Sequence, residues 1–556
     1  MTDKKTPRNK LATRWSVLKT ERATWWSHWK EISDYLLPRS GRFYTQDRNK
    51  GTRRHNSIYD STGTRALRVL AAGMMSGLTS PARPWFRLAT SDADLMKSDA
   101  VKLWLNEVTL IMHNVFQRSN TYRALHHIYE ELGTFGTAAC IILPDFKGVI
   151  HCYPLTTGEY AIATNWKGEV TTLYREFQKT VGEVVTEFGI ENVSQSVRSM
   201  YESGTIDAWV TIIHAIEPRT DRDPSKKDAK NMPWRSVYFE QGTNSEKYLR
   251  ESGFKRFPGV CPRWATSGGD VYGNSPGMEA LGDIKQLQHE QLRKAQGIDY
   301  KTNPPLQVPL SMKGRDVERL PGGVSYVDNV AAGGGIRSAF EVNLDLNHLL
   351  ADIQDVRERI RGSFYADLFL MLANQSDARM TATEVAERHE EKLLMLGPVL
   401  ERLQNELLDP LIEITFEQVL DAGIAPQPPE ELQGMDIQVD LVSMLAQAQR
   451  AVGTNSIDRF VGNLASVAQI KPEALDKFDV DRWVDIYSDS LGLDPEIITP
   501  DEKVEAIRKQ RAEAQAKAEQ AAMLNQQADT AHKLAGSNTG EQNALTDATR
   551  AFSGYS

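Results

Sequence analysis

The chain has few cysteines and lacks any long apolar segment. Its 556 residues include three cysteines, Cys140, Cys152 and Cys261, and no Cys-x-x-Cys pair, which argues against a disulfide framework or a zinc site. No apolar run approaches the roughly 20 residues that a membrane helix needs. No hydrophobic signal segment follows the opening Met-Thr-Asp-Lys-Lys. We therefore predict no membrane partner, and synthesis in a reducing cytoplasm.

The chain also lacks the motifs of common nucleotide and metal sites. No G-x-x-x-x-G-K-[ST] sequence occurs, so a P-loop is not expected. His126 and His127 have no metal-ligand spacing to another His or Cys. The acidic pair Asp352 and Asp355 lies among Arg residues on a predicted helix, which favours a solvated face over a catalytic dyad. We predict no catalytic residue, no metal ligand and no cofactor.

One sequence does match a catalytic motif literally. Residues 273–277 read Gly-Asn-Ser-Pro-Gly, the G-x-S-x-G of serine hydrolases, where the N–H after the serine helps to bind the oxyanion. Here Pro276 follows Ser275 and has no N–H. A serine hydrolase is therefore a disfavoured alternative, and a helix that starts at Pro276 with Ser275 as its N-cap is preferred.

Charge is distributed unevenly along the chain. Residues 1–54 contain fourteen Lys and Arg against five Asp and Glu, a net charge of +9, so a total of −9 leaves −18 for the rest. A basic arm on an acidic body favours an acidic partner. A monomeric DNA-binding protein with a basic arm is thus a second alternative. Four tryptophans in this arm could stack on bases, but docking of the helix on its own domain is preferred: Trp15, Trp25, Trp26 and Trp29.

Hydrophobic periodicity predicts an α+β fold that is mainly helical. Helices come first and antiparallel strands follow, with two hairpins where the period changes from 3.6 to two. The strands occupy the stretch from about residue 133 to residue 240. The predicted helices are 11–37, 58–78, 98–118, 122–132 and 181–188, and the predicted strands are 137–143, 149–153, 159–163, 169–177, 207–216 and 235–240.

The stretch from 269 to 420 organises the rest of the chain. Two amphipathic helices, 276–300 and 343–364, each carry one apolar stripe and one charged face. A loop over 365–380 separates them from a long helix that starts at the capping box Thr381-Ala-Thr-Glu384 and is kinked by Pro398 and Pro410. The side chains predicted to pack the two stripes are Leu281, Ile284, Leu346, Leu350, Ile353 and Ile360.

This order of parts resembles the portal, or head-to-tail connector, proteins of short-tailed double-stranded-DNA bacteriophages. Three strings carry the resemblance, which extends from about residue 10 to 425: 76–86 (SGLTSPARPWF), 272–281 (YGNSPGMEAL) and 378–385 (ARMTATEV). The resemblance implies a ring, usually of twelve copies, around a DNA channel at one capsid vertex. The implied partners are the major capsid protein, tail adaptor proteins, a terminase ATPase and double-stranded DNA read without sequence specificity. It also implies a virion protein made in the host cell cytoplasm.

Carried over by position, the resemblance divides the chain into the parts of a portal subunit. The parts are a wing (1–270), stem helices (271–300 and 343–364), a clip (301–342), a channel loop (365–380), a long kinked helix (381–425), a crown (426–500), a C-terminal helix that could form a barrel (501–535) and a disordered tail (536–556). Within the clip, Lys313, Arg315 and Arg319 are expected to contact the tail adaptor. The channel loop would place Asn374, Gln375, Ser376, Asp377 and Arg379 around the DNA. The match ends near residue 430.

Overall fold

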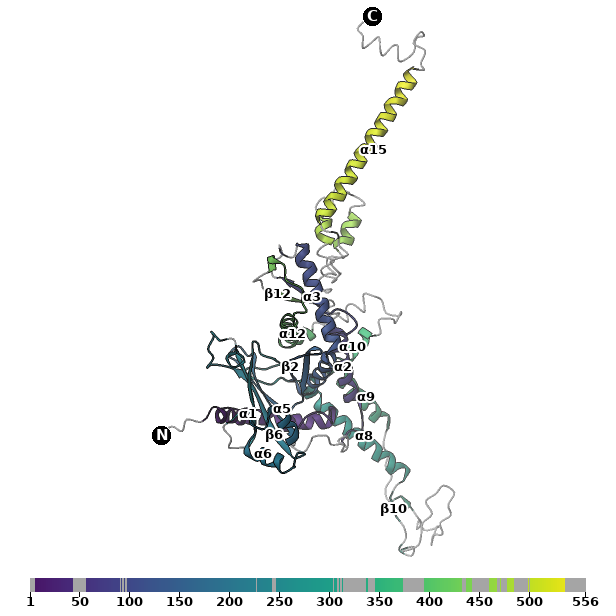
Figure 1. The fold of residues 1–556 in the computed structure, drawn as a ribbon. Helices are drawn as coiled ribbons and strands as arrows, with labels where there is room; N and C mark the ends of the chain where they lie inside the picture. Colours follow the sequence, from purple (N-terminus) through teal and green to yellow (C-terminus); the bar gives the residue numbers. More distant parts are fainter. Residues whose placement is uncertain are drawn as a thin grey trace, which may run out of the picture. The chain divides into compact units, whose positions relative to one another are not determined.

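The protein is described here from a computed structural model. The described residues are 6–43, 57–90, 92, 95, 98–226, 228–242, 247–303, 305–307, 310, 313, 337–338, 346–373, 395–432, 437–442, 460–467, 471, 478–484, 499 and 501–535. The chain divides into two compact units, Met1–Phe460 and Val461–Ser556. The first unit contains the sheets and most helices, and the second contains the long helix α15 (Asp501–Ala535) (Figure 1).

Four helices open the first unit, and they confirm the four predicted at the N-terminus. Pro7 begins the first helix. The N–H of the first helical residue has no partner within the helix, so proline loses no hydrogen bond there. The second helix starts at Thr62 rather than at residue 58. Gly136 ends the fourth with a left-handed φ of 73°. The helices are α1 (Pro7–Leu36), α2 (Thr62–Leu78), α3 (Asp99–Arg118) and α4 (Thr121–Phe135).

Antiparallel sheets follow, and both predicted hairpins are confirmed. One sheet has the strand order β4-β5-β6-β7-β8, and a second has the order β3-β2-β9. A capping box of Thr180 and Glu183 starts α5 (Val181–Phe188), and α6 is Gln195–Glu202. The strands are β2 (Ala139–Asp145), β3 (Val149–Leu155), β4 (Tyr160–Thr164), β5 (Val170–Thr180), β6 (Trp209–Pro218), β7 (Trp234–Glu240), β8 (Arg250–Phe254) and β9 (Gly259–Val260).

Helix α1 lies on the five-stranded sheet through its aromatic residues. Trp15 stacks on Tyr174 with ring centroids 6.2 Å apart, and Trp29 meets Tyr272 edge-on at 5.0 Å. Both tryptophans are buried, so the docking interpretation of these aromatics is confirmed. Arg8 Nη2 donates to the carbonyl of Glu240 at 2.6 Å. The N-terminal helix is therefore held on its own domain by two of its tryptophans and by Arg8.

The two central amphipathic helices are present, with one break in the first. A short helix, α7 (Pro276–Glu279), precedes α8 (Leu281–Thr302), and the break falls at Ala280, whose ψ is −6°. The second predicted helix is α9 (Leu346–Ser363). Side chains of α8 and α9 enter the largest apolar core together with those of α2, α3 and α4.

The prediction of a loop from residue 365 onward is wrong for residues 366–373. Tyr365 takes a left-handed φ of 52°, and a new helix, α10 (Ala366–Ala373), follows it. This apolar segment packs against α2, and that contact stabilises it as a helix. A Cβ on Gly73 of α2 would collide with the ring of Phe369, which is 5% exposed. The residues predicted to face the channel, Asn374, Gln375, Ser376, Asp377 and Arg379, lie outside the described residues.

The long helix is interrupted before its second proline. Residues 395–403 are helical, a π-helical turn covers Gln404–Leu408, and α12 continues over Asp409–Asp421. Pro410 cannot donate a backbone N–H, which suits a widened turn just before it. The predicted capping box at Thr381 lies outside the described residues.

The remaining described elements are short. Strand β1 (Phe86–Thr90) pairs with β12 (Ile437–Leu441), and β10 (Leu306–Gln307) pairs with β11 (Arg337–Ser338). Two 3-10 turns cover Ala229–Asn231 and Glu430–Leu432. Within the described residues, no helix is both long and apolar enough to cross a membrane, and no group of three or more His, Cys, Asp or Glu side chains could hold a metal.

Candidate functional site

Helices α8 and α9 lie side by side and form a hairpin that extends from the first unit (Figure 1). The short β10–β11 pair connects the far ends of its two limbs. We call the end near α2 the base of the hairpin and the end near β10 its tip. The two ends differ in how their apolar side chains are covered.

The base is packed within the chain. Leu281 and Ile284 of α8, and Ile353 and Ile360 of α9, are all buried in the main core. These are four of the six side chains predicted to pack the two stripes. The other two differ: Leu350 is 42% exposed, and the side chain of Leu346 lies outside the described residues.

Toward the tip, apolar side chains face solvent. Ile298 is 39% exposed, Tyr300 47% and Leu306 38%, in addition to Leu350. Ile298 and Tyr300 lie on α8, Leu350 lies on α9 and Leu306 lies on β10, so these exposed apolar side chains all belong to the tip region. The tip therefore offers apolar surface that a neighbouring molecule could cover.

A polar cluster fixes the base to the segment that precedes α2. Asp60 Oδ2 accepts from Gln291 Nε2 of α8 at 3.0 Å and from Arg357 Nη2 of α9 at 2.7 Å. The Gln288 amide completes the cluster, since its Oε1 accepts from the N–H of Asp60 at 2.8 Å and its Nε2 donates to the carbonyl of Asp60 at 3.0 Å. We call Asp60, Gln288, Gln291 and Arg357 the base cluster.

The base cluster holds Asp60 in its charged form. Burial alone would raise the pKa of Asp60, but hydrogen bonds from Thr62 and Arg357 outweigh it and lower the pKa below its usual value. One carboxylate thus joins three segments: the turn before α2, α8 and α9. No local sequence pattern predicts this cluster, since Asp60 and Arg357 are 297 positions apart.

Further along the hairpin, acidic residues of the two helices face each other. Burial raises the pKa of Glu290, the amide of Gln286 opposes that change, and the charge of Asp352 on α9 raises the pKa further. Arg359 of α9 lies 3.6 Å from Asp283 of α8. The polar face of the hairpin is therefore a mixture of charges with acids well represented, as the sequence predicts.

The predicted clip residues are sparsely described. Lys313 is exposed, whereas Arg315 and Arg319 lie outside the described residues.

Ser275 caps a helix and does not resemble a nucleophile. Its hydroxyl is 0% exposed, donates to the carbonyl of Thr134 at 2.8 Å and accepts from the N–H of Met278 at 3.0 Å. The glycine of the motif has a structural cause as well, because a Cβ on Gly273 would collide with the carbonyl of Gly136. The G-x-S-x-G match is therefore a helix start pressed against the end of α4, as preferred from the sequence.

A second long-range pair, which the sequence did not reveal, ties the π-helical turn to the strands. Arg263 binds Glu406 with two nitrogens, Nη2 to Oε1 at 2.6 Å and Nε to Oε2 at 3.2 Å. Its Nη2 also donates to the carbonyl of Gly168 at 2.7 Å. A bidentate Arg–carboxylate pair fixes orientation as well as distance, so the β4–β5 turn is held in a defined position against the long helix.

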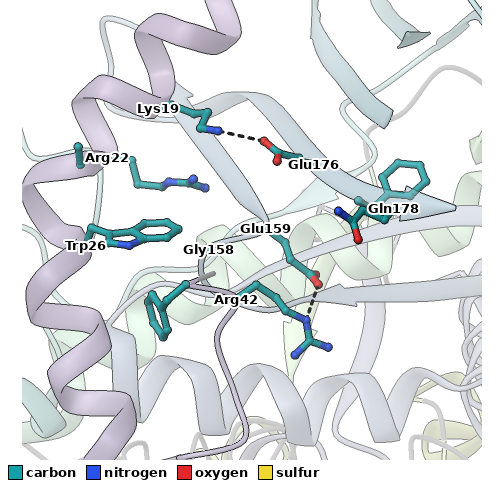
Figure 2. Close-up of a pocket in the computed structure, with 11 residues that line it drawn as sticks. Lys19, Arg22, Trp26, Arg42, Gly158, Glu159, Glu176 and Gln178 are labelled. Carbon is teal, nitrogen blue, oxygen red and sulfur yellow. Dashed lines mark hydrogen bonds and ion pairs between the residues drawn. The ribbon is translucent and has the colours of Figure 1, made fainter. Parts of the chain in front are cut away.

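A cavity of about 560 Å³ lies between α1, strand β5 and the residues just before β4 (Figure 2). Lys19 binds Glu176 at 3.1 Å, and Arg42 binds Glu159 at 3.3 Å. Burial raises the pKa of Glu159 although Arg42 opposes it. Among the described residues that line the cavity there is no Ser, Cys or His. Arg22, the remaining cation, lies over the ring of Trp26 at 4.8 Å and donates to the carbonyl of Tyr160.

The comparisons place the chain in a family of connector proteins. The family profile described as bacteriophage head to tail connecting protein matches residues 8–498. That match covers most of the sequence, so the chain belongs to this family. The resemblance noted in the sequence is thereby confirmed.

Two relatives named as portal proteins match over almost their whole length. The chain is 66% identical over 550 residues, 99% of both chains, to the probable portal protein of Bordetella phage BPP-1. It is 47% identical over 542 residues to the portal protein of Salmonella phage epsilon15, which covers 97% of this chain and 98% of that one. It also has a weak structural likeness to a chain in the neck of an empty gene transfer agent particle: TM-score 0.34, 12% identity, and coverage of 70% of this chain and 85% of that chain.

Proposed function

We propose that copies of this chain form the portal ring at one vertex of a phage capsid. Double-stranded DNA passes through the ring during packaging and ejection, and the tail attaches to it. The observation that carries the proposal is the α8–α9 hairpin, fixed at its base by Asp60 and apolar but uncovered toward its tip. Neighbouring copies in a ring would cover that tip. The family and the two portal relatives support the same conclusion.

In this proposal the hairpin is the stem of the portal. Residues 1–270 form the wing, and 301–342 form the clip that meets the tail adaptor proteins through Lys313, Arg315 and Arg319. Residues 426–500 form the crown, α15 contributes to a barrel, and 536–556 follow it as the tail of the chain. We propose twelve copies, with the major capsid protein around the ring and a terminase ATPase bound during packaging. The protein itself hydrolyses nothing.

The channel wall would have to hold DNA weakly at every position. Phosphate contacts from Lys and Arg supply most non-specific DNA affinity, and a wall rich in them would resist sliding. The mixed and partly acidic face of the hairpin suits such a wall, with Asp283, Glu290 and Asp352 beside Arg359. Residues 374–379 would form a narrow collar that keeps packaged DNA from slipping back.

Native mass spectrometry of the purified full chain tests the proposal. We expect a cyclic oligomer of about twelve copies, seen as rings by electron microscopy, with no ATPase activity. The chain could instead stay monomeric at high concentration and bind DNA fragments through residues 1–54. That result would reject the portal proposal in favour of a monomeric DNA-binding protein. That alternative is disfavoured because Arg8 of the basic arm is already buried against the sheet.

A further inference from the structure

The turn between β4 and β5 holds a tryptophan out in solvent. Trp166 is 89% exposed. The turn that carries it is well fixed, because Asn165 Oδ1 accepts from the N–H groups of Lys167 at 2.9 Å and Glu169 at 3.1 Å. Arg263, itself bound to Glu406, holds the carbonyl of Gly168 from the other side. A tryptophan presented on a fixed turn loses little freedom when a partner covers it, and this favours binding.

Lys167 makes the same tip positively charged. Its Nζ lies 5.3 Å from the centroid of the Trp166 ring, so the cation and the ring act as one unit. We call Trp166 and Lys167 the tryptophan tip. Its chemical complement is an apolar surface with a carboxylate beside it.

Such a surface lies on α3 of the same chain. Leu103 and Leu110 are 57% and 52% exposed, and Glu107 is exposed between them. Residues four and three positions apart share one face of a helix, so the three side chains form a single patch roughly 10 Å long. Glu107 makes no ion pair with any residue that the structure describes. Trp104, on another face of α3, donates to the carbonyl of Pro426 at 3.0 Å and so packs inward.

We propose that the tryptophan tip of one copy docks on the Leu103–Glu107–Leu110 patch of a neighbouring copy. The indole of Trp166 covers the leucines, and the ammonium of Lys167 pairs with Glu107. This contact rests on the ring assembly proposed above and assigns residues to one of its interfaces. A second copy is the favoured partner because both halves of the contact are on this chain and carry opposite charges. Two different surfaces that complement each other make a head-to-tail contact, which is the kind that closes into a ring.

Charge reversal tests the contact. Lys167→Glu and Glu107→Lys each bring like charges together, so each should raise the concentration for half-maximal ring formation by about tenfold. The double variant restores opposite charges and should return to within about threefold of the wild-type value. Trp166→Ala removes the indole but no charge and should weaken assembly by about tenfold as well. Ring formation is followed by native mass spectrometry of the full chain over a concentration series.

Lys147→Glu is the matched control. Lys147 follows the exposed Phe146 in the β2–β3 turn, where Asp145 Oδ2 accepts from the N–H of Lys147 at 3.2 Å. The same charge change there should alter assembly less than about twofold. Thermal unfolding checks that each variant folds. If a charge variant does not fold, Trp166→Ala decides the test. Single variants that assemble like wild type, or a double variant that does not recover, would overturn the contact and leave the ring proposal standing. A wild-type chain that never assembles would overturn both.

Discussion

At the scale of single residues, His214 is the clearest case of an ionisable group held neutral by its surroundings. It is 0% exposed on β6, and its ring stacks on Tyr238 with centroids 3.9 Å apart. Nδ1 accepts from Arg175 Nε at 3.2 Å, and Nε2 lies 2.8 Å from Ser236 Oγ. Burial lowers the pKa of His214 well below 6.5, and the charges of Arg175 and Arg250 lower it further.

We predict that the contribution of His214 to stability becomes unfavourable as the pH falls below about 6.5. Above that value His214 is neutral in both states and contributes no pH dependence. Below that pH, His214 binds a proton in the unfolded chain but stays neutral in the folded chain. The free energy of unfolding therefore falls until the pH reaches the folded-state pKa. Thermal unfolding between about pH 5 and about pH 8 measures the effect. His214→Gln should flatten the slope but leave a remainder, because burial also lowers the pKa of His113. Equal slopes in variant and wild type would contradict this account.

A second prediction at this scale concerns Asp60. Asp60→Ala deprives Gln291 and Arg357 of their shared acceptor and should destabilise the base of the hairpin by about 2 kcal/mol, since Arg357 keeps some contact with water. Amide hydrogen exchange should quicken in α8 and α9 and stay unchanged in β6.

The control for Asp60 lies on the same hairpin. Asp355 is 68% exposed and pairs with Arg359 of its own helix at 3.5 Å. Asp355→Ala should therefore change exchange in α8 by little, because an exposed pair within one helix contributes a few tenths of a kcal/mol. If both variants quicken exchange equally, Asp60 is not the anchor of the hairpin.

At the scale of elements, we expect the buried residues of the hairpin to control folding and its exposed apolar residues to control assembly. Ile353 is 1% exposed within one chain, whereas Leu350, one turn earlier, is 42% exposed. We predict that Ile353→Asp destabilises the single chain by several kcal/mol, because it buries an unpaired charge. Leu350→Asp should leave the unfolding temperature nearly unchanged but prevent ring formation.

The comparison needs a neutral position on the same helix. Asp355 is exposed on the face of α9 away from Leu350, so Asp355→Ala should affect neither the unfolding temperature nor the rings. Unfolding is followed by circular dichroism and assembly by native mass spectrometry. Normal rings from Leu350→Asp would mean that the tip of the hairpin does not meet a neighbouring copy at this residue.

Local patterns predicted most of these elements but not their long-range attachments. Ser275 followed by Pro276 predicted a helix start, and the 3.6 period predicted the burial of Ile353, because both signals lie within a few residues. The helix over 366–373 was missed because its apolar run has no polar alternation, and its cause lies in α2, where Gly73 makes room for Phe369. The base cluster was missed for the same reason, since Asp60 and Gln288 are 228 positions apart.

At the scale of the whole molecule, the second unit poses a separate question of stability. Its α15 spans Asp501–Ala535, 35 residues, and its described side chains are almost all exposed. Ile507, Met523 and Leu524 are among them, at 48%, 67% and 66%. A helix without a covered apolar stripe draws little stability from tertiary packing. Contact between copies would supply that packing in the barrel proposed for the assembled ring.

The contact between Gly136 and Gly273 has a mechanical consequence. There the backbone at the end of α4 meets the backbone just before α7, with no side chain between them. Side chains can change rotamer and so yield under a load, but two backbones in direct contact have little freedom to do so. A push along α8 would therefore pass through α7 into α4 and the sheet that follows it with little loss. We therefore expect the junction to be stiff along that line, which the proposed portal ring would need to withstand packed DNA.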